Sequence, residues 1–177
     1  GLADRAVMKF DKQYQIDKLK REKERAENSL AAFSMVLTKI EGQQSLTADL
    51  HDTLVELDAN PDKSGNMSEA IPRGGEIDVL AEQLMQAVSL RDALRTKYTP
   101  KHPEVVAQET VIRALIRRAR DTVGANLGLL KQQARSLRSN VGVQNKLAAD
   151  LDEQILERTT SRTALERELD AADMSYK

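Results

Sequence analysis

The chain has 177 residues, of which 40% are hydrophobic, 31% are charged and only 3% are aromatic. Two Phe, three Tyr and no Trp are too few to centre a thick globular core, because aromatic side chains bury the largest apolar areas. The 27 basic and 28 acidic residues nearly cancel, so no overall field attracts nucleic acid or an anionic membrane. The lack of cysteine excludes disulfides and thiolate metal sites.

Ala, Leu, Lys, Arg and Glu together make up close to half of the chain, which is typical of coiled coils and long helices. All four prolines lie between Pro61 and Pro103, so no proline interrupts a helix outside that zone. No apolar run approaches the roughly 20 residues that span a bilayer. Because the sequence begins and ends inside a helical pattern, we expect it to be a fragment of a longer protein.

The first expected element is a coiled-coil arm over residues 1–58. Up to Ile40 its apolar residues alternate at spacings of three and four, with Lys23 as the one polar member. After Gly42 the phase slips, and a leucine series that starts at Leu46 resumes the pattern. The arm therefore carries a narrow apolar stripe that needs a partner helix over most of its length.

The central zone predicts a loop, a short helix and a turn. Residues 59–75 are rich in turn formers and poor in apolar side chains, which is typical of a polar loop. A short helix over residues 76–98 then continues the first arm, with apolar spacing of three and four and a polar member at Arg91. Residues 99–103 form a tight hairpin turn, because they contain two prolines within a few residues.

A long return helix is expected over residues 104–177, where there is no proline. From Leu127 to Tyr176 the apolar pattern hardly breaks, and a period of 3.5 residues held this long indicates supercoiled helices. The two arms match in length, which predicts a long antiparallel coiled-coil helical hairpin of roughly 110 Å with a broken first arm. The alternative is a three-helix bundle in which the short helix folds back on the first arm.

The sequence offers no constellation for catalysis or for a cofactor. The only histidines are His51, on a polar helix face, and His102, in the turn, and neither has a second ligand at metal spacing. The basic run from Arg117 to Arg120 is interrupted by a seam residue and is typical of the solvated side of a coiled coil. We therefore expect a protein that is not an enzyme and binds no cofactor, metal or nucleic acid.

The turn is the most informative segment. Pro103 fits the first helical position, where its missing N–H is not needed, and Glu104 follows in the favoured acidic first turn. Either His102 or Thr99 can supply the helix cap. Tyr98 ends the apolar stripe of the short helix and would cover the hairpin tip. The hairpin-tip motif comprises Tyr98, Thr99, Pro100, Lys101, His102, Pro103, Glu104 and Val105.

Two segments carry a family resemblance. The first is Leu94–Val105, which contains a leucine, a tyrosine, a His-Pro pair and a following apolar residue. It resembles a segment in the periplasmic coiled coil of polysaccharide co-polymerases. These proteins are the chain-length determinants of exopolysaccharide export and are associated with bacterial tyrosine autokinases. A second segment, with Leu165, Arg167 and Tyr176, is similar to the membrane-proximal motif of that family. The resemblance implies a periplasmic segment of an inner-membrane protein, whose membrane helices would lie in segments missing from this sequence.

The resemblance also implies a function and partners. The hairpin would be a non-catalytic strut that helps to control polysaccharide chain length and export. Its partners would be other copies of the full-length protein and the polysaccharide polymerase or outer-membrane exporter components. Two alternatives stay open, namely the hairpin of a periplasmic adaptor in a secretion pump and a generic coiled-coil tether.

Overall fold

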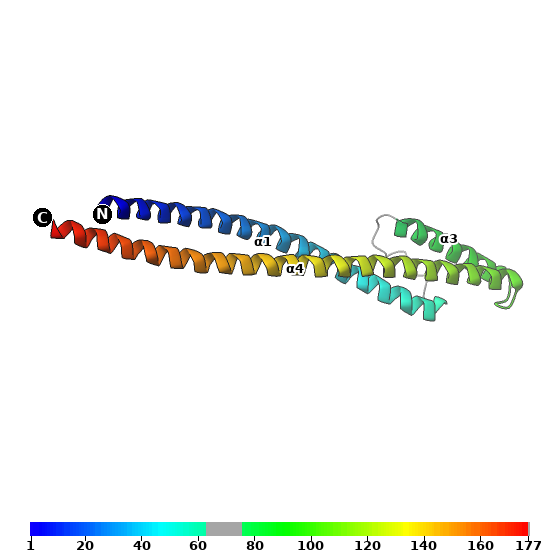
Figure 1. The fold of residues 1–177 in the computed structure, drawn as a ribbon. Coiled ribbons are helices and arrows are strands. Elements are labelled where there is room, and N and C mark those ends of the chain that lie inside the picture. The colour runs from blue at the N-terminus through cyan, green and yellow to red at the C-terminus, as the bar shows by residue number, and fades with distance from the viewer. Residues whose placement is uncertain (63–75, 177) are drawn as a thin grey trace. The chain divides into compact units, whose positions relative to one another are not determined.

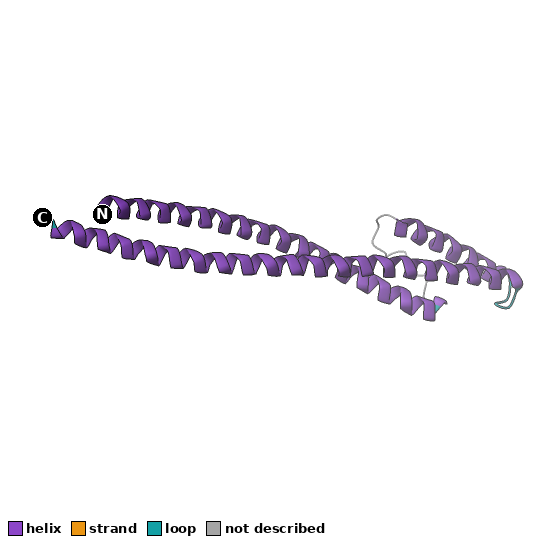
Figure 2. Ribbon diagram, viewed as in Figure 1, coloured by secondary structure: helices purple, strands orange, loops and turns teal. Residues whose placement is uncertain are grey.

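The computed structural model of the chain describes residues 1–62 and 76–176. Over this part of the chain the structure has three helices and no strand, as Figure 2 shows. The fold is all-α and is a helical hairpin, as the periodicity of the sequence predicts. Residues 63–75, most of the expected polar loop, lie outside the described part. The helices, labelled in Figure 1, are α1 (Leu2–Ala59), α3 (Glu76–Lys97) and α4 (Pro103–Ser175).

The structure divides into two compact units. The first unit contains Gly1–Thr38 and Arg135–Lys177, and the second contains Lys39–Ala134. In the first unit, α1 and α4 lie side by side and run in opposite directions, so the two ends of the chain lie at the same end of this unit (Figure 1). The first unit is therefore an antiparallel pair of helices.

Polar contacts fix the register of this pair. In three polar contacts between α1 and α4 of the first unit, the two residue numbers add up to 175, which is the pattern of antiparallel helices that pair without a slip. The contacts are the ion pair of Lys9 with Glu166 at 3.4 Å, the ion pair of Lys23 with Asp152 at 2.5 Å, and a hydrogen bond from Arg162 to Gln13.

The apolar seam of the first unit is thin. Ile16 is only 1% exposed, and Ala26 and Leu151 are also buried. Lys23 lies on the same seam and is half-buried. A lysine is tolerated there because its aliphatic stem packs along the seam while its ammonium group reaches a carboxylate at the edge.

In the second unit three helices share one core. The end of α1, residues 80–88 of α3 and the first third of α4 all contribute to it, so α3 shares its core with the last turns of α1 as well as with α4. The second unit thus has the local packing of a three-helix bundle, within a chain that is a helical hairpin. The core residues are Leu54 and Leu57 of α1, Leu80, Leu84, Ala87 and Val88 of α3, and Ile112, Ile116, Ala119 and Val123 of α4.

The width of the apolar face explains why α3 has two neighbours. Leu84 and Ala87 belong to the expected stripe, and Val88 is buried one position further round the helix. A face of this width exceeds the narrow seam of a two-helix contact and needs a second helix to cover it. The end of α1 contributes Leu54 and Leu57 to the same core.

The expected phase slip after Gly42 is not a slip of the packing. Leu46 is 64% exposed, whereas Gln44 and Thr47 are half-buried and continue the spacing of three and four from Ile40. Polar residues occupy the seam with α4 here. The position of the seam predicted from apolar residues alone was therefore on the wrong face of α1. The helix itself continues without interruption.

His51 also faces α4 and does not lie on a solvated face. A Cβ added at Gly124 would lie 3.4 Å from the His51 Nε2 atom, so the imidazole lies close to the bare backbone of this glycine. Glycine within a helix costs about 0.5–1 kcal/mol relative to alanine. At Gly124 the absence of a side chain leaves room for the imidazole of His51 from α1.

Candidate functional site

The hairpin turn connects α3 and α4 by few residues and is closed by backbone hydrogen bonds. The Tyr98 N–H donates to the Leu94 carbonyl at 2.9 Å, which ends α3. The His102 N–H donates to the Thr99 carbonyl at 3.0 Å and so reverses the chain. Pro103 is the first residue of α4, the position expected for it from its missing N–H.

His102 caps α4. Its carbonyl accepts the first helical bond, from the Val106 N–H at 3.0 Å, and its Nδ1 atom accepts a hydrogen bond from the Glu104 N–H at 3.3 Å. The imidazole therefore satisfies one of the backbone donors that a helix N-terminus leaves without a partner. Of the two caps that the sequence allows, His102 and Thr99, the structure uses His102.

The rings of Tyr98 and His102 stack on each other. Their centroids are 3.9 Å apart and the planes are inclined by 15°. This contact joins the residue that follows α3 to the residue that caps α4, so the two helix ends are linked by side chains as well as by the turn. The Tyr98 side chain is 38% exposed.

The rest of the tip divides into a buried anchor and an exposed surface. Val105 is fully buried and anchors the first turn of α4. Outside it, the exposed residues Tyr98, Thr99, Pro100 and Lys101 form a contiguous stretch, which we call the tip surface.

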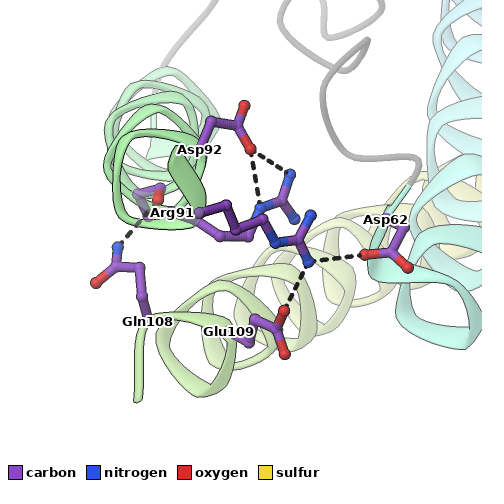
Figure 3. Close-up of polar contacts among 7 residues, drawn as sticks. Asp62, Arg91, Asp92, Gln108 and Glu109 are labelled. Atoms are coloured by element: carbon purple, nitrogen blue, oxygen red, sulfur yellow. Dashed lines mark hydrogen bonds and ion pairs between the residues drawn. The ribbon is translucent and has the colours of Figure 1, made fainter. Parts of the chain in front are cut away.

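A polar brace lies behind the tip. Arg95 of α3 donates through one guanidinium nitrogen to Glu109 of α4 at 2.6 Å and to Asp62, just beyond α1, at 3.4 Å. Figure 3 shows Asp62 and Glu109 directed to the same guanidinium group. The hydrogen bond from Arg95 to Glu109 is the largest cause that raises the pKa of Arg95. The brace was not predicted from the sequence, because its members lie on three segments.

Two further polar contacts accompany the brace (Figure 3). Gln108 of α4 donates from Nε2 to the Ala87 carbonyl of α3 at 3.0 Å. Arg91, the expected polar member of the α3 stripe, is 4% exposed, and its Nε and one terminal nitrogen each lie 3.2 Å from Asp92. The contact of Gln108 attaches α3 to α4, whereas the contact of Arg91 lies within α3 and places a buried charge next to an exposed carboxylate.

Asp58 connects the end of α1 to α4. Its carboxylate, 17% exposed, accepts from Arg117 at 3.1 Å and from Arg120 at 2.5 Å. Two arginines of the basic run therefore bind a carboxylate of this chain, while Ala119 between them is buried in the core. The run forms part of the packing of the second unit.

The second sequence motif is not brought together as a site. Leu165 is half-buried on α4, and Arg167 is exposed two residues later, because residues two apart lie on different faces of a helix. Tyr176 lies beyond the end of α4, and its ring is 82% exposed. Its N–H donates to the Asp173 carbonyl at 3.3 Å.

Comparison of the chain with protein-family models, curated proteins and solved structures finds no match. Within residues 1–62 and 76–176 there is no group of three or more His, Cys, Asp or Glu side chains placed to hold a metal ion. None of the helices described has the length and apolarity needed to cross a membrane.

Proposed function

We propose that this chain is a non-catalytic periplasmic coiled-coil segment of an inner-membrane protein that regulates polysaccharide chain length and export. In this proposal the hairpin is a strut, and the tip surface docks onto a polymerase or an outer-membrane exporter component. The resemblance of Leu94–Val105 to the polysaccharide co-polymerases supports this assignment. The second motif, at Leu165, Arg167 and Tyr176, adds support from the sequence.

The observation that carries the proposal is the way the tip is held. The cap from His102 to the Glu104 N–H, the stack of Tyr98 on His102 and the buried Val105 all restrain the same short turn. A surface that is already ordered loses less conformational entropy on binding than a flexible loop. The brace of Arg95 between Glu109 and Asp62 holds the helices directly behind the turn.

The test uses the full-length gene in the bacterium that encodes this chain. We expect deletion of the gene to change the length distribution of one exported polysaccharide. The variant Lys101→Glu, which reverses the one charge of the tip surface, should change that distribution at an unchanged protein level. The matched control is Lys131→Glu on α4, because Lys131 is also exposed but lies far along the chain from the tip.

Two results would contradict the proposal. One is a deletion strain whose polysaccharides keep their normal length while secretion or efflux fails, which would favour a pump adaptor. The other is a Lys101→Glu strain and a Lys131→Glu strain with equal effects, which would mean that the tip surface has no special role.

A further inference from the structure

The two units of the chain differ in how many apolar side chains they bury. Among the described residues of the first unit, only Ile16, Ala26 and Leu151 are buried apolar side chains. In the second unit, one core cluster alone contains ten buried residues from three helices. Burial of apolar surface is the main favourable term in folding and grows with the area buried, so the helices of the first unit are held together more weakly.

Other apolar residues on the seam of the first unit stay partly open to water. Leu19 and Leu30 of α1 and Leu137 of α4 are half-buried, although they lie on the expected apolar stripe. In a pair of helices each seam residue is covered by one neighbour only, whereas three helices enclose a core. Each of these leucines therefore contributes less to stability than a fully buried leucine would.

Ion pairs at the edges of the seam add to the attachment in the first unit. Lys9 pairs with Glu166 and Lys23 pairs with Asp152, and these four side chains are between 29% and 60% exposed. Exposed ion pairs contribute little to stability and are screened by salt. In the second unit, by contrast, the Asp58 carboxylate that joins α1 to α4 is only 17% exposed, so salt screens it less. Salt should therefore weaken the first unit more than the second.

From these differences we infer that the first unit opens in a step of its own, in which α1 and α4 separate there while the second unit, with the hairpin tip, stays folded. Units of one protein open with different free energies, and a unit with few buried apolar contacts opens most readily. The closed pair is the form that the structure describes, and the open form is a minor state in equilibrium with it. The contact that holds the two ends of the chain together is then weak and sensitive to salt. This inference does not depend on the proposed function.

The experiment measures opening through single cysteines in the whole chain, which has no cysteine of its own. Ala26→Cys places a thiol in the seam of the first unit, and Ala119→Cys is the matched variant in the core of the second, since these alanines are 3% and 5% exposed. A water-soluble maleimide labels either thiol only when the surrounding helices separate. With each rate divided by that of the same chain in denaturant, the Ala26→Cys chain should react at least about tenfold faster than the Ala119→Cys chain.

Salt and two truncations test whether the steps are separate. Raising NaCl from about 0.1 M to about 1 M shortens the screening length from about 10 Å to about 3 Å, and should speed labelling of the Ala26→Cys chain alone, by about two- to fivefold. Ile16→Ala and Ile112→Ala remove the same side chain from the two units, at positions that are 1% and 0% exposed. Ile16→Ala should speed labelling of the Ala26→Cys chain by about tenfold or more and leave the Ala119→Cys rate unchanged. Ile112→Ala should do the reverse.

An Ala119→Cys rate equal to or above the Ala26→Cys rate would overturn the inference, because the chain would then open in one step or from its other unit. So would an Ile112→Ala chain in which both rates rise by the same factor, or an Ala26→Cys rate that does not change with salt. If a truncated chain fails to fold, the rates and salt dependence of the two single-cysteine chains still decide between the outcomes.

Discussion

The ring of Tyr98 stacks on the ring of His102 with 3.9 Å between centroids, while the Nδ1 atom of His102 accepts from the Glu104 N–H. One imidazole therefore both caps α4 and stacks on the residue that follows α3. The contacts of this side chain therefore join the two helix ends at the tip.

The first prediction separates the two roles of His102. We expect His102→Ala to lower the free energy of unfolding by about 0.5–2 kcal/mol, because it removes the cap and the stack together. His102→Asn should lower the free energy of unfolding by less than His102→Ala does, because asparagine can still cap the helix although it cannot stack on Tyr98. Urea denaturation followed by circular dichroism measures both. Equal losses in the two variants would mean that the cap contributes nothing.

The second prediction concerns the link from α1 to α4. Asp58→Asn should lower the free energy of unfolding by about 1.5–3 kcal/mol, because Asp58 accepts charged hydrogen bonds from Arg117 and Arg120 in a largely buried position. Asp121→Asn is the control. This variant removes Asp121, a second partner of Arg120 whose side chain is 73% exposed. It should lower the free energy of unfolding by less than about 1 kcal/mol. A loss at Asp58 no larger than at Asp121 would argue against this link.

The third prediction uses the glycines of α4. Gly128→Ala and Gly142→Ala should each raise the free energy of unfolding by about 0.5–1 kcal/mol, because a new Cβ meets nothing within 4 Å and alanine favours helix. Gly124→Ala should raise the free energy of unfolding by less, because its new Cβ would lie against the imidazole of His51. Thermal unfolding of the three variants checks the order. A gain at Gly124 that equals the others would show that the imidazole moves away freely.

The fourth prediction concerns pH. The hydrogen bond to Asp152 is the largest cause that raises the pKa of Lys23 above its ordinary value of 10.5. A raised folded-state pKa gives stability that is complete below 10.5 and is lost as the pH rises through the folded value. The difference in unfolding free energy between wild type and Lys23→Met should therefore shrink from about pH 9 to about pH 12.

The control for this pH dependence is the same substitution in an Asp152→Asn chain, which lacks the carboxylate partner of Lys23. In that background the difference in unfolding free energy should change less over the same pH range. If the difference for Lys23→Met in the wild-type background is constant with pH, the contact with Asp152 does not stabilise the charged lysine.

Periodicity predicted most of the fold. The seam of α4 follows the heptad pattern, and Pro103 begins this helix as its missing N–H requires. The apolar pattern predicted the wrong seam position where the seam is polar. There Gln44 and Thr47 face α4 without being apolar, whereas the apolar Leu46 is exposed. It also missed that the end of α1 shares a core with α3, because that depends on tertiary packing and not on the local pattern of either helix.

The candidate site was predicted in part. Backbone rules limited the cap to His102 or Thr99, and only the geometry distinguishes the two. The stack of Tyr98 on His102 depends on side-chain rotamers that a sequence does not encode locally. The brace around Arg95 depends on tertiary neighbours from α1 and α4, so no local motif could have indicated it.

The most direct test of the account is the distance between spin labels on cysteines introduced at Leu2 and Met174, both of which are exposed. Labelled chains are diluted with unlabelled ones so that only pairs within one chain contribute. Because α1 and α4 run antiparallel in the first unit, we expect a separation of about 1–3 nm, the spacing of adjacent helices plus the label arms. A separation near the length of α4, about 11 nm for its 73 residues, would contradict the hairpin.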